Sequence, residues 1–406
     1  MKSKAYNLFI FFIAFPCIDI FGLSITLFLF FSHLIFTKYK FSNPFSSLIY
    51  SGIFISALIS LFSSYFISEV DNPSITNTLL LFARLFYWLS VGLYFEKNFK
   101  VEYIYNTSKY FFYGLLFSIC TYYFFQFEFE LGPIKYSYIF RRNEFVFNFL
   151  CSFPFAYHFV TNQKTLRYFK FLFIILCFLA MSFTDGRSGF ILFIFQILVI
   201  YLITNNFQKK NIFKYFSFAV FLFLIITSFN IKIADLIRPV SERTANLILS
   251  EGDGDINYDK SLMVRSLMID KSVSIIKEYP VAGIGFGNFI NYDYDLIELR
   301  KYDRLLKAGF RDKYFNTRST HNTYLEILTE FGIIGGIIFA LLFYKGLTIF
   351  LNNIFKQKII YLSLPFITIL IYFGFISALT GTITWVLIGI SRSKIFISDD
   401  KFYNKN

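Results

Sequence analysis

The amino-acid sequence predicts an all-α polytopic membrane protein with about twelve transmembrane helices and one large loop outside the membrane. Of its 406 residues, 56% are hydrophobic and 23% are aromatic, and the mean hydropathy is +0.56. A soluble chain cannot bury so large a share of apolar side chains. Apolar runs of roughly 18 to 20 residues recur along the chain, which is the length that crosses the hydrocarbon core of a bilayer as a helix.

Twelve apolar segments are long enough to be interpreted as transmembrane helices. Pro16 and Asp19 interrupt the first apolar stretch and divide it into two segments. The connections between most segments are short and polar. The predicted spans are residues 7–19, 20–36, 48–67, 77–95, 108–126, 145–160, 168–183, 188–204, 213–230, 331–350, 358–376 and 379–397.

The basic residues support twelve spans and give their orientation. With a cytoplasmic N-terminus, eighteen Lys and Arg residues fall in inner segments and four in the short outer segments, as expected for cytoplasmic loops. Merging the first two spans would place every later basic loop outside. The inner residues are Lys2, Lys4, Lys38, Lys40, Lys97, Lys100, Lys164, Arg167, Lys170, Lys209, Lys210, Lys214, Lys356, Lys358, Arg392, Lys394, Lys401 and Lys405; the outer ones are Lys135, Arg141, Arg142 and Arg187.

We therefore expect a multi-pass protein of the bacterial inner membrane with both termini in the cytoplasm. Residues 1–230 hold the first nine spans, residues 231–330 form a long non-spanning stretch in the periplasm, and residues 331–406 hold the last three spans and a cytoplasmic tail. Because the other connections are short, a loop of this length indicates function. The net charge of +13 follows from the topology, so no nucleic-acid partner is needed to explain it.

The stretch STHNTYLEILTEFGIIGG, residues 319–336, contains His321, the one histidine of three that the predicted topology places outside. Ser319 or Thr320 can cap a helix, so a helix is expected to begin near His321. The positive end of a helix disfavours the imidazolium form, and a neutral imidazole at the membrane surface suits a general base. A histidine that only caps or packs is the alternative interpretation.

Polar and small residues follow His321 at helical spacing. Asn322, Glu326 and Glu330 lie four residues apart and form one polar stripe on an otherwise apolar helix. Gly332 and Gly336 have the spacing of glycines that allow close helix packing. Asn322 and Glu326 are therefore candidate substrate-binding residues, beside a candidate base.

Two arginines are further candidates on the outer side. Arg265 lies in an amphipathic helix that ends at Pro280 and is followed by a glycine-rich turn. Arg187, in the sequence TDGRSGF, lies at the outer end of the eighth span. Either guanidinium group can bind an anionic substrate. The alternatives are that Arg187 extends to the lipid headgroups and that Arg265 pairs with an acidic residue of the loop.

Two motifs that resemble ligand sites are excluded. GIGFGN, residues 283–288, lacks both the spacing and the β-α-β context of a dinucleotide fingerprint. DGDINYD, residues 253–259, begins like a calcium loop but has Tyr258 where glycine is required and Val264 where glutamate is required. No other metal-ligand set is evident outside, and Cys17, Cys120, Cys151 and Cys177 lie in apolar runs without disulfide or metal spacing.

These features together resemble the O-antigen ligase and O-antigen polymerase superfamily. The resemblance rests on the twelve spans with a large late loop, on GRSG at the outer end of a mid-chain span, on the R…YPVAGIGFGNF segment and on HNTYLEILTEFGIIGG. In detail it covers about residues 180 to 340. In this sequence Asp-Gly precedes Arg187, where the family often has Ser or Thr.

The resemblance implies an integral-membrane glycosyltransferase of the GT-C class that uses undecaprenyl-diphosphate-linked glycans as donors. His321 would then act on the acceptor hydroxyl, and Arg187 and Arg265 would hold the donor diphosphate. Guanidinium groups can stabilise the departing phosphates without a metal, so we expect a metal-independent enzyme without a cofactor. The expected partners are the lipid-linked donor, a glycan or lipid A-core acceptor, membrane lipid and a chain-length regulator.

Four functions fit this chemistry or topology. The composition, rich in Phe, Ile and Asn, resembles products of variable polysaccharide gene clusters and favours a polymerase of lipid-linked repeat units over a ligase that transfers the glycan to lipid A-core. A protein-directed oligosaccharyltransferase would be expected to carry additional recognition sequence. A transporter or flippase is less favoured, because no internal repeat is evident and the predicted spans hold few charges, namely Asp19, Arg84, Lys109 and Lys345.

Overall fold

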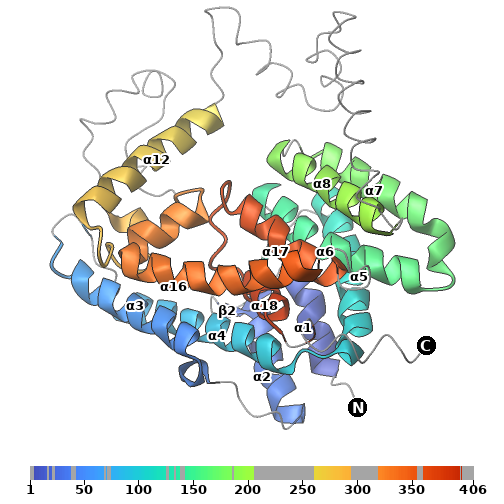
Figure 1. Ribbon diagram of the computed structural model, residues 1–406, viewed down its shortest axis with the longest axis horizontal. Coiled ribbons are helices and arrows are strands. Elements are labelled where there is room, and N and C mark those ends of the chain that lie inside the picture. Colours follow the sequence, from blue (N-terminus) through green and yellow to red (C-terminus); the bar gives the residue numbers. More distant parts are fainter. Residues whose placement is uncertain are drawn as a thin grey trace, which may run out of the picture.

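The computed structural model shows a bundle of α-helices with one small β-sheet (Figure 1). It describes residues 4–15, 18–20, 23–37, 43–67, 70, 75–124, 128–131, 134–137, 142–184, 187–204, 260–293, 319–353, 360–393 and 395. The helices are α1 (Lys4–Ala14), α2 (Ile25–Thr37), α3 (Leu48–Ser64), α4 (Ile75–Asn98), α5 (Val101–Phe124), α6 (Arg142–Asn162), α7 (Lys170–Ser182), α8 (Arg187–Thr204), α12 (Lys260–Glu278), α16 (Thr323–Asn353), α17 (Ile360–Tyr372) and α18 (Thr382–Ser391).

A helix occupies eleven of the twelve predicted spans, and the ninth, residues 213–230, lies outside the described residues. Among the described residues, Thr76–Asn98 and Thr323–Asn352 are long and apolar enough to cross a membrane, and six further apolar helices are shorter. This composition of helices is consistent with a membrane protein. The number of helices that cross the membrane stays a prediction.

The connections α1–α2 and α5–α6 meet in a four-stranded antiparallel sheet, which the all-α prediction missed. The strands β1 (Ile18–Ile20) and β2 (Leu23–Ser24) form the first connection, and β3 (Glu128–Leu131) and β4 (Ile134–Ser137) form the second. Their order is β2-β1-β4-β3. The pairing of β1 with β4 places both connections at the same end of the bundle. The connection that carries β1 and β2 divides the first apolar stretch into two helices, as predicted.

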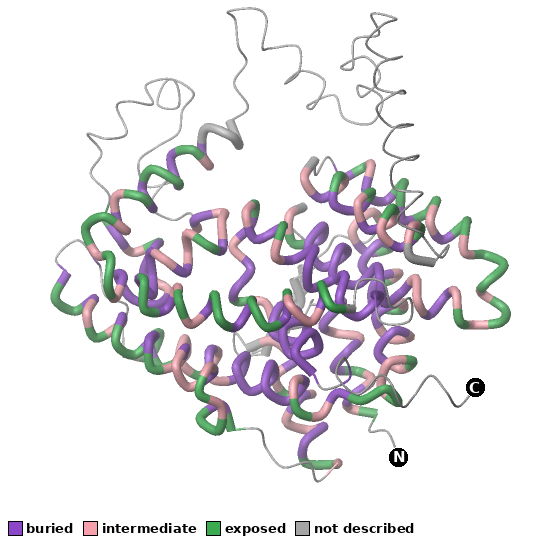
Figure 2. The backbone as a smooth tube through the Cα atoms, viewed as in Figure 1, coloured by how far each residue is buried: buried purple, intermediate pink, exposed green. Residues whose placement is uncertain are grey.

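The two shortest helices of the C-terminal part lie in the centre of the bundle. Nearly every residue of α17 and α18 is buried, and Figure 2 shows buried backbone concentrated where these helices lie. The outer faces of the other helices instead expose large apolar side chains. Such a surface is unfavourable in water and suits contact with lipid chains. The exposed residues include Phe62, Phe66, Phe171, Leu172, Phe183, Ile191, Ile337, Leu341 and Tyr344.

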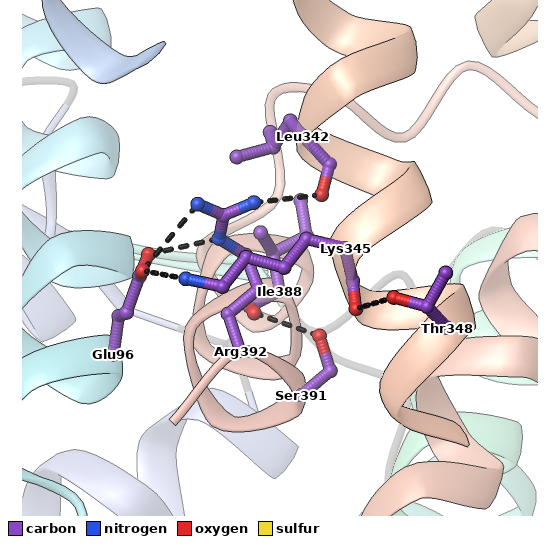
Figure 3. Close-up of polar contacts among 7 residues, drawn as sticks. All are labelled: Glu96, Leu342, Lys345, Thr348, Ile388, Ser391 and Arg392. Atoms are coloured by element: carbon purple, nitrogen blue, oxygen red, sulfur yellow. Dashed lines mark hydrogen bonds and ion pairs between the residues drawn. The ribbon is translucent and has the colours of Figure 1, made fainter. Parts of the chain in front are cut away.

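An ion-pair cluster joins α4, α16 and the end of α18 (Figure 3). Arg392 Nε donates to Glu96 Oε2 at 2.8 Å, and the side chain of Arg392 is only 3% exposed. A second guanidinium nitrogen donates to the backbone carbonyl of Leu342 at 3.0 Å. Lys345 Nζ donates to Glu96 Oε1 at 3.0 Å, so one carboxylate balances two cations. Lys345 therefore has a structural partner, although the sequence showed it only as a charge within a span.

We expect Glu96→Gln to destabilise the bundle strongly. The substitution leaves the buried Arg392 charge facing a neutral amide, and breaking a buried pair typically costs about 3 to 5 kcal/mol. Lys345→Met is the matched control, because the Lys345 side chain is 46% exposed and its loss should cost less than about 1 kcal/mol. Thermal unfolding in detergent measures both. Equal unfolding temperatures for the two variants would contradict a structural role of the Glu96–Arg392 pair.

Candidate active site

The helix α16 is broken at Gly332, whose φ of 63° and ψ of −166° are not helical. A break leaves backbone groups without their helical partners. Residues 280–285 replace these partners: the Ile284 amide donates to the Thr329 carbonyl at 2.9 Å, and the Ile333 amide donates to the Pro280 carbonyl at 2.8 Å. The segment YPVAGIGFGNF is thus docked by its backbone onto the break in α16.

Glycine is required at the two closest points of this contact. Gly283 has a φ of 69°, and a Cβ atom there would lie 2.6 Å from the Thr329 carbonyl oxygen. A Cβ atom on Gly332 would overlap the Val281 carbonyl. Gly332 therefore serves the docking of a loop segment, whereas the sequence suggested that it serves helix packing. The glycines of GIGFGN have a backbone role and do not mark a dinucleotide site.

A second hydrophobic core, separate from that of the bundle, holds α12 against the docked segment. It combines apolar side chains of α12 with others from residues 284–292 and with two residues that follow α3. The pairing of Val70 with Tyr292 as an isolated β-bridge strengthens this contact. We call this arrangement the outer unit. Its buried core residues are Ile67, Val70, Val264, Leu267, Met268, Ile275, Ile284, Phe289 and Tyr292.

Lys271 of α12 lies inside the outer unit, and its side chain is only 2% exposed. Its Nζ donates to the Tyr292 carbonyl at 2.8 Å and lies 4.9 Å from the centre of the Phe289 ring. Burial lowers the pKa of Lys271 to about 8, and the charge of Asp293 opposes this shift. Lys271 therefore ties α12 to the docked segment by its ammonium group.

The lowered pKa of Lys271 predicts a pH-dependent stability. Between about pH 8 and pH 10.5 the folded protein loses this proton before the unfolded chain does, so stability rises with pH in this window. The gain is complete above 10.5 and lost as the pH falls through 8. Lys271→Met should abolish this rise. Thermal unfolding of both proteins at pH 7 and pH 10 measures it, because the other titrating groups cancel in the comparison. An identical pH dependence in both would contradict it.

His321 lies in the turn that precedes α16, and its backbone φ is 52°. Within the part of the chain that the structure describes, no other non-glycine residue has a positive φ. The predicted N-cap, Ser319 or Thr320, was wrong, since Asn322 caps the helix: its Oδ1 accepts from the Tyr324 and Leu325 amides at 3.0 and 3.1 Å. His321 therefore precedes the helix and does not lie in its first turn.

The turn of His321 is fixed to the segment that follows α17. The Thr323 amide donates to the Phe373 carbonyl at 2.8 Å, and the Thr323 hydroxyl donates to the Ile376 carbonyl at 2.6 Å. The hydroxyls of Thr320 and Ser377 are hydrogen-bonded at 2.8 Å. A left-handed backbone costs about 1 to 2 kcal/mol for a residue with a Cβ atom. Contacts on both sides hold His321 in this conformation. Unfavourable backbone conformations that the surrounding structure holds in place are frequent at functional sites.

Two glutamates lie below this turn on the same face of α16. Glu330 is only 4% exposed, and its Oε1 accepts from the Phe289 amide at 3.4 Å. One carboxylate oxygen of Glu326 and one of Glu330 are buried without a hydrogen-bond partner among the described residues. The predicted polar stripe thus points into the protein, toward the docked segment and the residues after α17.

Four of the five predicted site residues lie on two packed helices or in the turn directly before one of them. Arg265 lies half-buried on α12, which packs on α16. His321 and Asn322 directly precede α16, and Glu326 lies in its first turn. Arg187 is the first residue of α8, which packs on α17 and α6, and its side chain lies outside the described residues. Asn322 caps the helix and also donates to the Gly374 carbonyl at 3.4 Å. A role of these five residues in substrate binding or catalysis stays a prediction.

Residues outside the predicted catalytic and binding set provide the scaffold of this site. Lys271 lies in the outer unit, and Thr320 and Thr323 anchor the turn of His321. In the sequence, the one signal for these roles is a polar side chain beside apolar residues. Among the residues that the structure describes, no group of three or more His, Cys, Asp or Glu side chains is placed to hold a metal ion. Metal independence of the chemistry stays a prediction.

A bundle of apolar helices that expose large apolar side chains is consistent with a helical membrane protein. Residues 172–340 match the family model described as O-antigen ligase, and all five candidate residues lie within this range. The match confirms the resemblance to the O-antigen ligase and polymerase superfamily, a family of bacterial membrane proteins, and indicates an O-antigen ligase-type function. No curated protein matches the chain.

Proposed function

We propose that this protein is an inner-membrane glycosyltransferase that polymerises undecaprenyl-diphosphate-linked oligosaccharide repeat units into O-antigen or another surface polysaccharide. The observation that carries the proposal is the packing of α12 on the broken start of α16. Within the segment that matches the O-antigen ligase family, it joins the helix of Arg265 to the strained turn of His321. A cation and a candidate base on two packed elements would supply what transfer from a lipid diphosphate needs.

The proposed reaction moves a glycan between two oxygen atoms. An acceptor hydroxyl attacks the anomeric carbon of the donor glycan, and His321 takes the hydroxyl proton. The new glycosidic bond forms as the bond between the anomeric carbon and the phosphate oxygen breaks, and undecaprenyl diphosphate leaves with the electron pair. Arg265 and Arg187 hold the diphosphate and stabilise its charge without a metal. Asn322 and Glu326 line the acceptor side of the same site.

The contacts of the outer unit support its position in the periplasm. A Cβ atom on Gly285 would contact Ser64 at the end of α3, and one on Gly287 would contact Leu81 near the start of α4. The docked segment also contacts the start of α16. The twelve-span topology places all three helix ends on the outer side. It places the Glu96–Arg392 pair and the exposed Lys100 on the cytoplasmic side.

Cysteine labelling tests this topology. In a cysteine-free background, Asp255→Cys should react with a membrane-impermeant maleimide in cells whose inner membrane is intact. Lys100→Cys, between α4 and α5, is the matched control and should react only after the inner membrane is opened. Protection of Asp255→Cys until the membrane is opened would contradict the topology and the site with it.

Ligation of the glycan to lipid A-core is the alternative function, because the same site can serve another acceptor. The glycans of a deletion strain separate the two. Loss of a polymerase leaves single repeat units on lipid A-core, whereas loss of a ligase leaves long polymer on the lipid carrier and none on lipid A-core. A transporter or flippase, the less favoured function, would instead leave lipid-linked repeat units at the inner face. Unchanged surface glycan would contradict all three.

A further inference from the structure

We infer that Glu330 is a positioning residue that docks residues 280–289 onto the break in α16 and so fixes α12, with Arg265, relative to the turn of His321. The inference rests on the proposed function and extends it to a residue outside the predicted catalytic and binding set. Three connected contacts carry it: Glu330 to the docked segment, the docked segment to α12, and the start of α16 to the residues after α17.

The first contact uses both the side chain and the backbone of Glu330. Its carboxylate accepts from the Phe289 amide at 3.4 Å, and its backbone carbonyl accepts from the Gly285 amide at 3.1 Å. The Gly287 amide also faces this carboxyl group. The Phe289 amide is buried at this contact, so the loss of its acceptor would leave a buried donor without a hydrogen bond. Because Glu330 is buried, this loop cannot exchange the carboxylate for water without undocking.

The second contact passes from the docked segment to α12 through the outer unit. Phe289 belongs to the same buried core as Leu267 and Met268 of α12, which are close in sequence to Arg265. Lys271 donates to the Tyr292 carbonyl at 2.8 Å, and the Tyr292 hydroxyl donates to Glu278 at 2.8 Å. These bonds hold α12 at its middle and at its end. A shift of the docked segment therefore displaces the helix that carries Arg265.

The third contact fixes the start of α16, and with it the turn of His321, to the residues after α17. Glu330 lies about two helical turns below Asn322, on the part of α16 that precedes the break. Asn322 caps this part, and Thr323 bonds it to Phe373 and Ile376. His321 is thus held by α16 and the residues after α17, whereas Arg265 is held by α12. Glu330 is the side chain of α16 that bonds the segment between them.

The test compares Glu330→Ala with Glu330→Gln in the purified protein, with a lipid-linked polymer as donor and a single lipid-linked repeat unit as acceptor. We expect Glu330→Ala to raise the KM for the lipid-linked donor about tenfold or more, since small displacements of binding groups have effects of this size, and to leave the acceptor KM unchanged. Glu330→Gln should recover part of the loss, because its amide oxygen can still accept from Phe289. Glu144→Gln is the matched control, since Glu144 is an exposed carboxylate in the first turn of α6.

A double variant separates docking from general stability. Gly283→Ala introduces a Cβ atom 2.6 Å from the Thr329 carbonyl and should undock the same segment. If both residues act through docking, Glu330→Ala combined with Gly283→Ala should raise the donor KM no further than the larger single effect. A purely structural role would lower the amount of active protein and the apparent kcat, with both KM values unchanged.

Amide hydrogen exchange gives a readout that does not depend on activity. In Glu330→Ala, residues 279–293 should exchange faster than in the wild type, while α4 and α17 should not change. Unchanged exchange, or an unchanged donor KM in a protein that transfers glycan, would overturn the inference. Faster exchange in a protein whose wild type transfers no glycan would support the docking role of Glu330 and contradict the proposed function.

Discussion

Replacing His321 by alanine is expected to stop glycan transfer, while the protein is still made and inserted and the donor accumulates unextended on its lipid carrier. General-base catalysis contributes about 100- to 10,000-fold, so the loss should be nearly complete in cells. The structure adds a physical reason for the choice of residue. His321 occupies a left-handed turn that is anchored on both sides, so its position is set by the fold and not by its own conformational preference.

His321→Gln separates proton transfer from positioning. Glutamine keeps hydrogen-bonding capacity but cannot accept a proton at neutral pH, so inactivity of this variant would support a base. Wild-type glycan from His321→Gln would show that the residue only positions or packs. His158→Gln is the matched control: His158 is hydrogen-bonded to Ser108 at 3.2 Å, at the helix ends that the topology places on the cytoplasmic side. It should leave transfer unchanged.

Arg265→Ala and Arg187→Ala are each expected to lower transfer by about 100- to 1,000-fold, the effect of removing one preorganised donor to a developing negative charge. Lysine at either position should restore only part of the activity, because an ammonium group cannot make the two-pronged contact of a guanidinium. Transfer of a lipid-linked donor by membranes that contain equal amounts of each variant measures the effect.

A matched control distinguishes this role from loss of a positive charge in general. Arg167→Ala removes an exposed arginine on the predicted cytoplasmic side and should have no effect on transfer. Full activity of both Arg265→Ala and Arg187→Ala would remove the two arginines from the mechanism. Full activity of Arg187→Ala alone would favour the interpretation that Arg187 only extends to the lipid headgroups.

The helices of the bundle could be predicted from the sequence because long apolar runs have few alternatives in a membrane. The small sheet could not, because its strands have two to four residues and β1 pairs with β4 across more than one hundred residues. The same holds for the Glu96–Arg392 pair. Each partner was visible as a charge in or beside an apolar segment, but their contact depends on how α4 and α18 pack.

The candidate site shows the same division between local and tertiary information. The sequence made His321 a candidate and predicted the polar stripe, since both follow from residue type and helical spacing. It misplaced the N-cap, because Thr320 bonds Ser377 of a distant segment and leaves the cap to Asn322. It also assigned Gly332 to helix packing. The docked segment that needs this glycine lies far from it in the sequence and is adjacent only in the folded protein, so no local pattern could show the contact.

Glycan transfer by the purified protein in lipid nanodiscs tests the central claim most directly. The reaction contains an undecaprenyl-diphosphate-linked repeat unit as donor and acceptor, with a chelator of divalent metals in excess. We expect a ladder of lengthened lipid-linked glycans from the wild type and none from His321→Gln under the same conditions. A wild-type protein that forms product only when magnesium is added, or a His321→Gln protein that forms the same ladder, would contradict it.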